Sequence, residues 1–255
     1  MSPDQPRVSG FPGGTSVTRL AVYSGQCTSD GLAGGTPHLH TASTEAYVVT
    51  GGQGVLQTLD TAGFRETPLA PGTTVWFTPG TIHRVVNHRN LQIVVIMENA
   101  GLPEAGDAVM TFPAPIVGDP ERYRSAATLP TGAAPGELDE AVRRRRDLAV
   151  EGFRILVAAA ERSDRRPLDD LYDSAMTLVR PKIAGWRRIW RDTVERQTRH
   201  TGDVLAALAG GDGHHLRSSA VLESPPSPAA GWGMCGRLHT HDVTHPIVRS
   251  PIADR

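Results

Sequence analysis

The chain has 255 residues, enough for one large domain or for a medium domain with an appended region. Its formal net charge of -1 gives no electrostatic reason to expect binding to nucleic acid or to an acidic membrane. The longest strongly apolar stretch, residues 93–97 with their neighbours, is too short to span a bilayer, and the N-terminal residues lack the apolar core of a signal peptide. We therefore expect a cytoplasmic protein with no nucleic-acid partner and no membrane partner.

Residues 16–112 have the pattern of short strands separated by turns. Turn signals such as Pro71-Gly72 and the Gly-Gly-Gln-Gly sequence at 51–54 interrupt short apolar runs. The predicted strands are 17–23, 36–41, 45–50, 55–59, 64–69, 73–78, 82–88 and 91–97. Many short strands of this kind predict an antiparallel sandwich or barrel.

The composition changes after this strand-rich part. Residues 119–136 are rich in Pro, Gly and Ala and indicate a linker. Apolar residues recur at helical spacing within 137–212, where Pro181 is expected to kink or end a helix, and we expect these helices to pack on the strands. Residues 213–255 form a tail that can add a strand. The predicted units are therefore 1–118, 119–136, 137–212 and 213–255.

A basic run, Arg143 to Arg146, lies within the first helical stretch. Successive helical residues face different directions, so half of the run must point away from any one partner. A solvated helix face is therefore favoured over nucleic-acid binding.

The sequence HLHTASTE, residues 38–45, brings two imidazoles and a carboxylate close together in the chain. Alternate side chains of a strand point to the same face, so His38 and His40 project together while Leu39 points away. Glu45 opens the next predicted strand. These three side chains are of the types that serve as metal ligands, and together they suggest part of a metal site.

A fourth ligand is available after the Pro79-Gly80 turn. His83 begins an apolar strand and shares a face with Val85 and Asn87. If the sheet curls into a barrel, His83 meets His38, His40 and Glu45 in its interior. The alternative is a barrel whose buried histidines are only hydrogen-bonded, which is disfavoured because burying three imidazoles and a carboxylate without a metal is costly.

These two clusters resemble the motifs of the cupin superfamily. The first motif is matched by Gly35, His38, His40, Glu45 and Gly52, and the second by Gly72, Pro79, Gly80, His83 and Asn87. The turn proline stands one place later than in the strict consensus, which leaves the histidine spacing intact. The resemblance covers about residues 16–112. It implies a mainly β fold, a cupin-type antiparallel β-barrel (jelly roll) over 1–118, followed by an α-helical C-terminal region. It also implies dimerisation, since dimers are common among cupins.

The expected cofactor is one divalent metal ion per chain, held by His38, His40, Glu45 and His83. This donor set suits Fe, Mn, Ni, Co, Cu or Zn without choosing among them. Tyr47 and Val49 share the strand parity of Glu45 and are predicted to line a substrate pocket, with Gln57 as a polar neighbour. An octahedral ion with four protein ligands keeps two positions for substrate or oxygen.

The resemblance implies a metal-dependent enzyme that acts on a small organic molecule, with dioxygenase-type chemistry favoured and Glu45 able to act as a base. Two alternatives remain open: a sugar isomerase, epimerase or lyase, and a non-catalytic sensor or regulator that binds a small ligand. The fold alone does not identify the substrate.

The tail contains a second pattern of metal-binding residue types. Cys235, His239, His241 and His245 have a spacing that can bind zinc, but they lack the glutamate and glycines of a cupin motif. We expect the tail histidines to be dispensable for the first metal, and their own role stays open.

Overall fold

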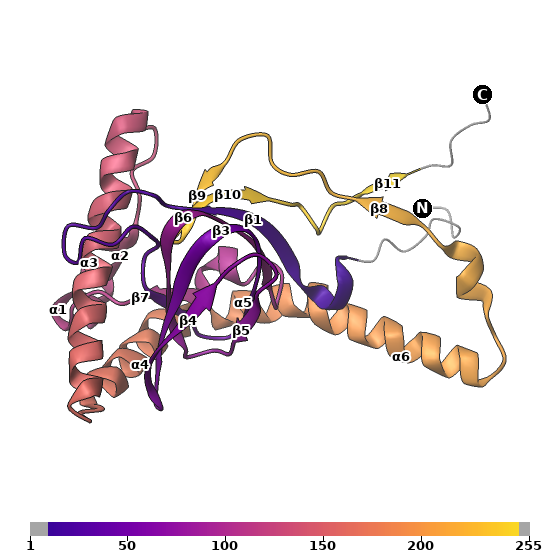
Figure 1. The fold of residues 1–255 in the computed structure, drawn as a ribbon. Helices are drawn as coiled ribbons and strands as arrows, with labels where there is room; N and C mark the ends of the chain where they lie inside the picture. Colours follow the sequence, from indigo (N-terminus) through magenta and orange to yellow (C-terminus); the bar gives the residue numbers. More distant parts are fainter. Residues whose placement is uncertain (1–9, 250–255) are drawn as a thin grey trace.

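In the computed structural model, residues 10–249 are described, and Figure 1 shows how they are arranged. Residues 1–9 and 250–255, at the outer ends of the predicted 1–118 and 213–255 units, lie outside the described residues. No helix within 10–249 is long and apolar enough to cross a membrane.

A nine-stranded antiparallel sheet forms the centre of the molecule. Its strands are β1 (Ser16–Val22), β2 (His38–His40), β3 (Glu45–Asp60), β4 (Gly63–Leu69), β5 (Thr74–Phe77), β6 (Ile82–Met97), β7 (Ala108–Met110), β9 (Gly231–Trp232) and β10 (Gly236–Thr240). The main path runs β4-β3-β6-β1-β10-β9, while β5 pairs with β3, β2 with β6, and β7 with β2. The predicted antiparallel β fold with a following helical region is confirmed. Within 10–249 the pairings make an open, branched sheet and do not close into a ring.

The two longest strands each merge a pair of predicted ones. The glycine-rich sequence 51–54, expected as a turn, lies inside β3 as a series of register shifts against β6. Gly52 has φ +74°, and a Cβ there would stand 2.2 Å from the carbonyl oxygen of Asn90, so only glycine fits. The strand therefore bulges and continues, because its pairing with β6 shifts register at Gly51 and Gln53 and becomes regular again from Gly54.

Within the described part of the chain, six α-helices follow or cover the sheet. They are α1 (Ala114–Val117), α2 (Pro120–Ala127), α3 (Pro135–Glu161), α4 (Arg166–Val179), α5 (Ile183–Trp190) and α6 (Arg196–Ala209). The stretch 119–136, expected as a linker, contains α2. As predicted, the chain leaves the α-helix at Pro181, where a 3-10 turn (Arg180–Lys182) separates α4 from α5.

The sheet has a separate apolar cluster on each of its faces. Leu20, Tyr47, Leu56 and Ile93 belong to the cluster on the inner face. On the outer face, a second cluster joins strand residues to helix residues: Leu39, Leu59 and Ile82 with Phe153, Leu171 and Trp186. The helices α3, α4 and α5 therefore share one core with the sheet.

The C-terminal segment returns to the sheet after a long excursion. The helix α6 buries no residue and extends away from the sheet toward the two-stranded pair of β8 (Val221–Glu223) and β11 (Ile247–Arg249) (Figure 1). In the part of the chain between β8 and β11, the strand β10 pairs with residues 18–22 of β1. The tail thereby becomes part of the main sheet.

Candidate metal centre

Four buried side chains from three strands converge on one point. His38 and His40 come from β2, Glu45 is the first residue of β3, and His83 is the second residue of β6. His38 and His83 are direct cross-strand partners. One ligand atom of each residue lies within 4.8 Å of the others, and their exposed fractions are only 0–5%. The cluster can hold a metal ion.

Backbone carbonyls fix the orientation of two of the imidazoles. His38 Nδ1 lies 2.8 Å from the carbonyl oxygen of Thr36, and His83 Nδ1 lies 3.2 Å from that of Thr81. Because a carbonyl oxygen only accepts, each Nδ1 carries the proton and donates it. The Nε2 atoms are left unprotonated and free to bind a metal.

The atoms that face the centre lack hydrogen-bond partners. Glu45 Oε2 lies 3.2 Å from His40 Nε2 and 3.0 Å from His83 Nε2. Even so, neither Glu45 Oε2 nor His83 Nε2 makes a hydrogen bond of acceptable geometry. Buried polar atoms without partners are costly, and a divalent cation among them would satisfy both. The residues present therefore fit a metal ion.

Asp107 supports the centre from behind, and the sequence pattern did not reveal it. Its Oδ2 lies 3.4 Å from His40 Nδ1, so the imidazole stands between two carboxylates. Its side chain also accepts hydrogen bonds from the backbone N–H groups of Thr41, Ala42 and Ser43 and from the Thr41 hydroxyl. Carboxylates in this position orient metal-binding histidines. Asp107 lies 62 residues beyond Glu45, outside both motifs, so no local spacing marked it.

The charges in the centre shift the ionisation of its members in different directions. Burial, together with the neighbouring His83 and His40, holds the pKa of His38 well below its usual value. For His40, burial acts downward, but contacts with Asp107 and Glu45 outweigh it and raise the pKa to about 9. Burial acts upward on Glu45, yet His83 and His40 hold its pKa well below the usual range. In the metal-free centre, an anionic Glu45 therefore faces a protonated His40.

The sequence around this centre matches a known family. Residues 29–97, which contain all four cluster residues, match the model of the cupin domain. This part of the chain is a cupin domain. No curated protein sequence matches the chain.

Several solved structures are similar to part of the chain. Pac13 from Streptomyces, described as a nucleoside dehydratase and solved with uridine, is 17% identical with a TM-score of 0.30, over 39% of this chain and 69% of that one. A predicted oxalate decarboxylase from Thermotoga maritima is 17% identical with a TM-score of 0.25, over 33% and 64%. The capsular polysaccharide assembling protein CapF from Staphylococcus aureus is 20% identical with a TM-score of 0.25, over 38% and 23%.

A cavity of about 700 Å³ opens beside the ligands of the cupin domain. His38, His40 and Glu45 line it, so three of the four candidate ligands border this space. Its walls are mainly apolar and include Leu20, Val95, Met97, Met110, Trp232 and Leu238. A volume of this size is suitable for a small organic molecule. Part of the wall comes from the tail, since residues 232–235 contribute to it.

Tyr47 and Val49, which were predicted to line the substrate pocket, are buried away from the cavity beside the candidate metal ligands. The Tyr47 ring is buried against Phe77, with ring centroids 5.3 Å apart, and its hydroxyl lies 3.9 Å from Cys235 Sγ. Val49 is part of the inner apolar cluster. Neither residue lines the cavity beside the ligands, because neighbouring side chains cover them.

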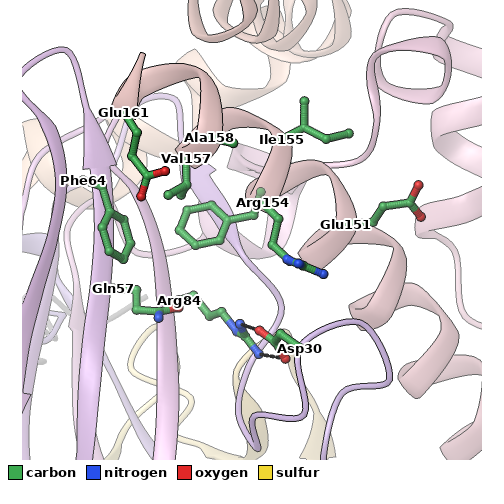
Figure 2. Close-up of a pocket in the computed structure, with 11 residues that line it drawn as sticks. Asp30, Gln57, Phe64, Arg84, Glu151, Arg154, Ile155, Val157, Ala158 and Glu161 are labelled. Carbon is green, nitrogen blue, oxygen red and sulfur yellow. Dashed lines mark hydrogen bonds and ion pairs between the residues drawn. The ribbon is translucent and has the colours of Figure 1, made fainter. Parts of the chain in front are cut away.

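Gln57 lies on the opposite face of the sheet from the metal centre. Figure 2 shows it beside Phe64 and Arg84 in a different pocket, and its side-chain amide donates to Glu66 at 2.9 Å. The bulges at 51–54 explain this position. They change the strand parity, so Leu56 and not Gln57 continues the inward row of Glu45 and Tyr47.

The tail residues do not assemble a second cluster. His239 Nδ1 contacts the Ser227 carbonyl oxygen at 3.1 Å, and His241 Nδ1 contacts that of Ser224 at 2.7 Å. His245 is exposed beside Asp242, and Cys235 lines the cavity of the cupin domain. Among residues 10–249, His38, His40, Glu45 and His83 form the only group of this kind that could hold a metal.

Proposed function

We propose that the protein is a metal-dependent enzyme that converts a small organic molecule in the cavity beside His38, His40 and Glu45, by dioxygenase-type chemistry. The observation that carries this proposal is the convergence of three imidazoles and a carboxylate, three of whose buried atoms lack hydrogen-bond partners, on the wall of a cavity. Structural zinc sites are usually closed on all sides. An open side favours chemistry over a structural role.

Each residue has a distinct part in this proposal. His38 and His83 present unprotonated Nε2 atoms, His40 does so once it has lost its proton, and Glu45 adds the negative charge that favours a divalent cation. Asp107 lies within ion-pair distance of His40 on the side opposite Glu45 and would orient its ring. A bound metal ion would supply Lewis acidity and, if it is iron, a means of activating oxygen. The apolar cavity walls exclude water from the reacting part of the substrate.

An isomerase or lyase is the second candidate, and the position of Glu45 favours it. The Glu45 carboxylate lines the cavity, and it is ionised because, against the upward effect of burial, His83 and His40 hold its pKa well below the usual value. A carboxylate in this position can take a proton from a substrate carbon without any oxygen.

Oxygen uptake separates the two reactions. Iron(II)-loaded protein is mixed with a panel of small carboxylic acids, sugars and nucleosides in an oxygen electrode. The proposal predicts oxygen consumption that requires both the metal and one class of substrate, and that is lost in His83→Ala. Conversion of a substrate at an undiminished rate without oxygen, with zinc or manganese sufficing, would contradict dioxygenase chemistry and favour the isomerase or lyase.

A further inference from the structure

The basic run Arg143–Arg146 does not form a single solvated face. Arg143 and Arg144 are exposed and pair with Asp139 and Glu140 of the same helix. Arg146 is buried and donates to the carbonyl oxygens of residues 25 and 26 at 2.6 and 2.7 Å. Arg145 turns toward the cupin domain and lines the cavity that contains the metal ligands.

Arg145 is a half-buried cation without a carboxylate partner. No Asp or Glu oxygen among the described residues lies within ion-pair distance of it. Its Nη1 and Nη2 atoms donate to the carbonyl oxygens of Ala127 and Gly233, at 3.2 and 3.4 Å, and its buried Nε has no partner.

The surroundings of Arg145 leave its charge uncompensated. Burial lowers the pKa of Arg145, and the ionisable groups nearest to it, Tyr23 and Tyr123, have pKa values that burial raises, so both are neutral at pH 7. The other inward arginine with a side chain at a pocket, Arg84, contrasts with it, because Asp30 neutralises that guanidinium (Figure 2). A buried guanidinium without an anion is unfavourable, and a ligand that brings one would relieve the cost.

The cavity places this cation and the metal ligands around the same apolar space. Arg145 is the only Arg or Lys among its lining residues within 10–249. The acidic lining residues are Glu45, which belongs to the metal centre, and Glu104, which is exposed. A ligand that fills the cavity therefore borders the Arg145 side chain, the apolar walls and the residues of the metal centre.

We propose that Arg145 binds the carboxylate of the substrate, and that the substrate is a small carboxylic acid with an apolar body and a second oxygen that reaches the metal centre. The planar guanidinium matches a carboxylate through two parallel hydrogen bonds. One arginine neutralises one negative charge, so a monoanion fits this position better than a phosphate dianion. This inference rests on the proposed function, because it uses the same cavity.

Matched acids and amides test the role of Arg145. Binding of 3-phenylpropionate, 3-phenylpropionamide and phenyl phosphate to zinc-loaded protein is measured by titration calorimetry, together with benzoate and benzamide. The wild type is compared with Arg145→Gln, with Arg145→Lys, and with Arg144→Gln as a control on the exposed side of the same helix. Metal content and thermal melting are recorded for each variant.

The inference predicts that at least one acid binds to the wild type about tenfold or more tightly than its amide, since a hydrogen bond to a charged group contributes roughly 1.5–3 kcal/mol. Arg145→Gln removes this preference, Arg145→Lys keeps part of it, and Arg144→Gln keeps all of it, with metal content unchanged. An acid preference that survives in Arg145→Gln, or no preference for any acid in the wild type, overturns the inference. Tighter binding of phenyl phosphate than of the acids also overturns it. Failure of the wild type to bind zinc would instead contradict the proposed function, and the acid preference can then be measured by the same titrations on the metal-free protein.

Discussion

Asp107 lies directly behind His40, one of the proposed metal ligands. Its carboxylate lies 3.4 Å from His40 Nδ1 and is fixed by hydrogen bonds from Thr41, Ala42 and Ser43. Burial acts to raise its pKa, but the contacts with His40 and Thr41 outweigh burial and hold the pKa below its usual range. The Asp107 carboxylate is therefore ionised at neutral pH, as a fixed negative charge beside His40.

Replacing Asp107 by Asn should weaken metal binding while leaving all four ligands in place. Removing such an outer carboxylate typically lowers metal affinity about 10–100-fold. Chelator competition on Asp107→Asn measures the change, with the partly exposed Asp60→Asn as the control for loss of a carboxylate elsewhere. An unchanged affinity in Asp107→Asn would show that Asp107 serves only to anchor the loop.

Metal binding should also depend on pH through His40. Its pKa of about 9 in the metal-free centre means that a proton must leave before the ring can bind a metal. The apparent affinity should therefore rise with pH, by up to about tenfold per unit below pH 9. His38, whose pKa is lowered by burial and by His83, is already neutral and adds nothing to this slope.

The metal-free protein should show the opposite trend in stability. A raised pKa for His40 stabilises the fold below the unfolded value of about 6.5, and this contribution is lost as the pH rises through about 9.

Calorimetry in buffers of different ionisation enthalpy measures proton release at pH 7.5, where about one proton per metal is expected from His40. Metal binding without any proton release would contradict this assignment.

At the scale of elements, the helix α3 approaches the end of β7 so closely that a side chain is excluded. A Cβ on Gly152 would lie 2.0 Å from the Thr111 carbonyl oxygen and 2.7 Å from the carbonyl carbon of Phe112. Gly152→Ala should therefore destabilise the protein by about 1–3 kcal/mol in urea denaturation. Gly136, in the same helix, has open space around it, and Gly136→Ala should be neutral or slightly stabilising. Equal effects of the two substitutions would show that α3 can shift away from the sheet.

The sequence predicted those features whose signal is local. Alternation along β2 placed His38 and His40 on one face, and the position of His83 at the start of its strand brought it to the same point. Gln57 could not be placed, because the bulges at 51–54 change the strand parity and their number cannot be read from a glycine-rich sequence. Asp107 and Arg145 come from distant segments and have no motif, so only tertiary packing brings them to the site.

At the scale of the whole molecule, the sheet and four of the helices, α1, α3, α4 and α5, depend on the same core. The outer cluster joins Leu59 and Ile82 of the strands to Phe153 of α3, Leu171 of α4 and Trp186 of α5. The tail contributes β10 to the sheet and residues 232–235 to the cavity wall. Neither the helical region nor the tail has a separate apolar core of comparable extent among the described residues.

This shared core predicts a single unfolding transition. Far-ultraviolet circular dichroism, which reports mainly on the helices, and fluorescence of the tryptophans should give superimposable urea curves. The expected midpoint is the same for both probes and shifts upward together when metal is added, because the metal binds only the folded sheet. Helix loss at a clearly lower urea concentration would show that 137–212 is an independent unit.

The metal content of the purified chain tests the central claim most directly. Protein prepared without a histidine tag is analysed by mass spectrometry of its metals, alongside His38→Ala/His83→Ala, the more conservative Glu45→Gln, and His239→Ala/His241→Ala as a matched control. The account predicts about one divalent metal per chain in the wild type and in the tail variant, strong loss in the His38/His83 variant, and reduced occupancy in Glu45→Gln, with circular dichroism confirming the fold. Full metal retention in a folded His38→Ala/His83→Ala protein, or loss of half of the metal in the tail variant, would contradict it.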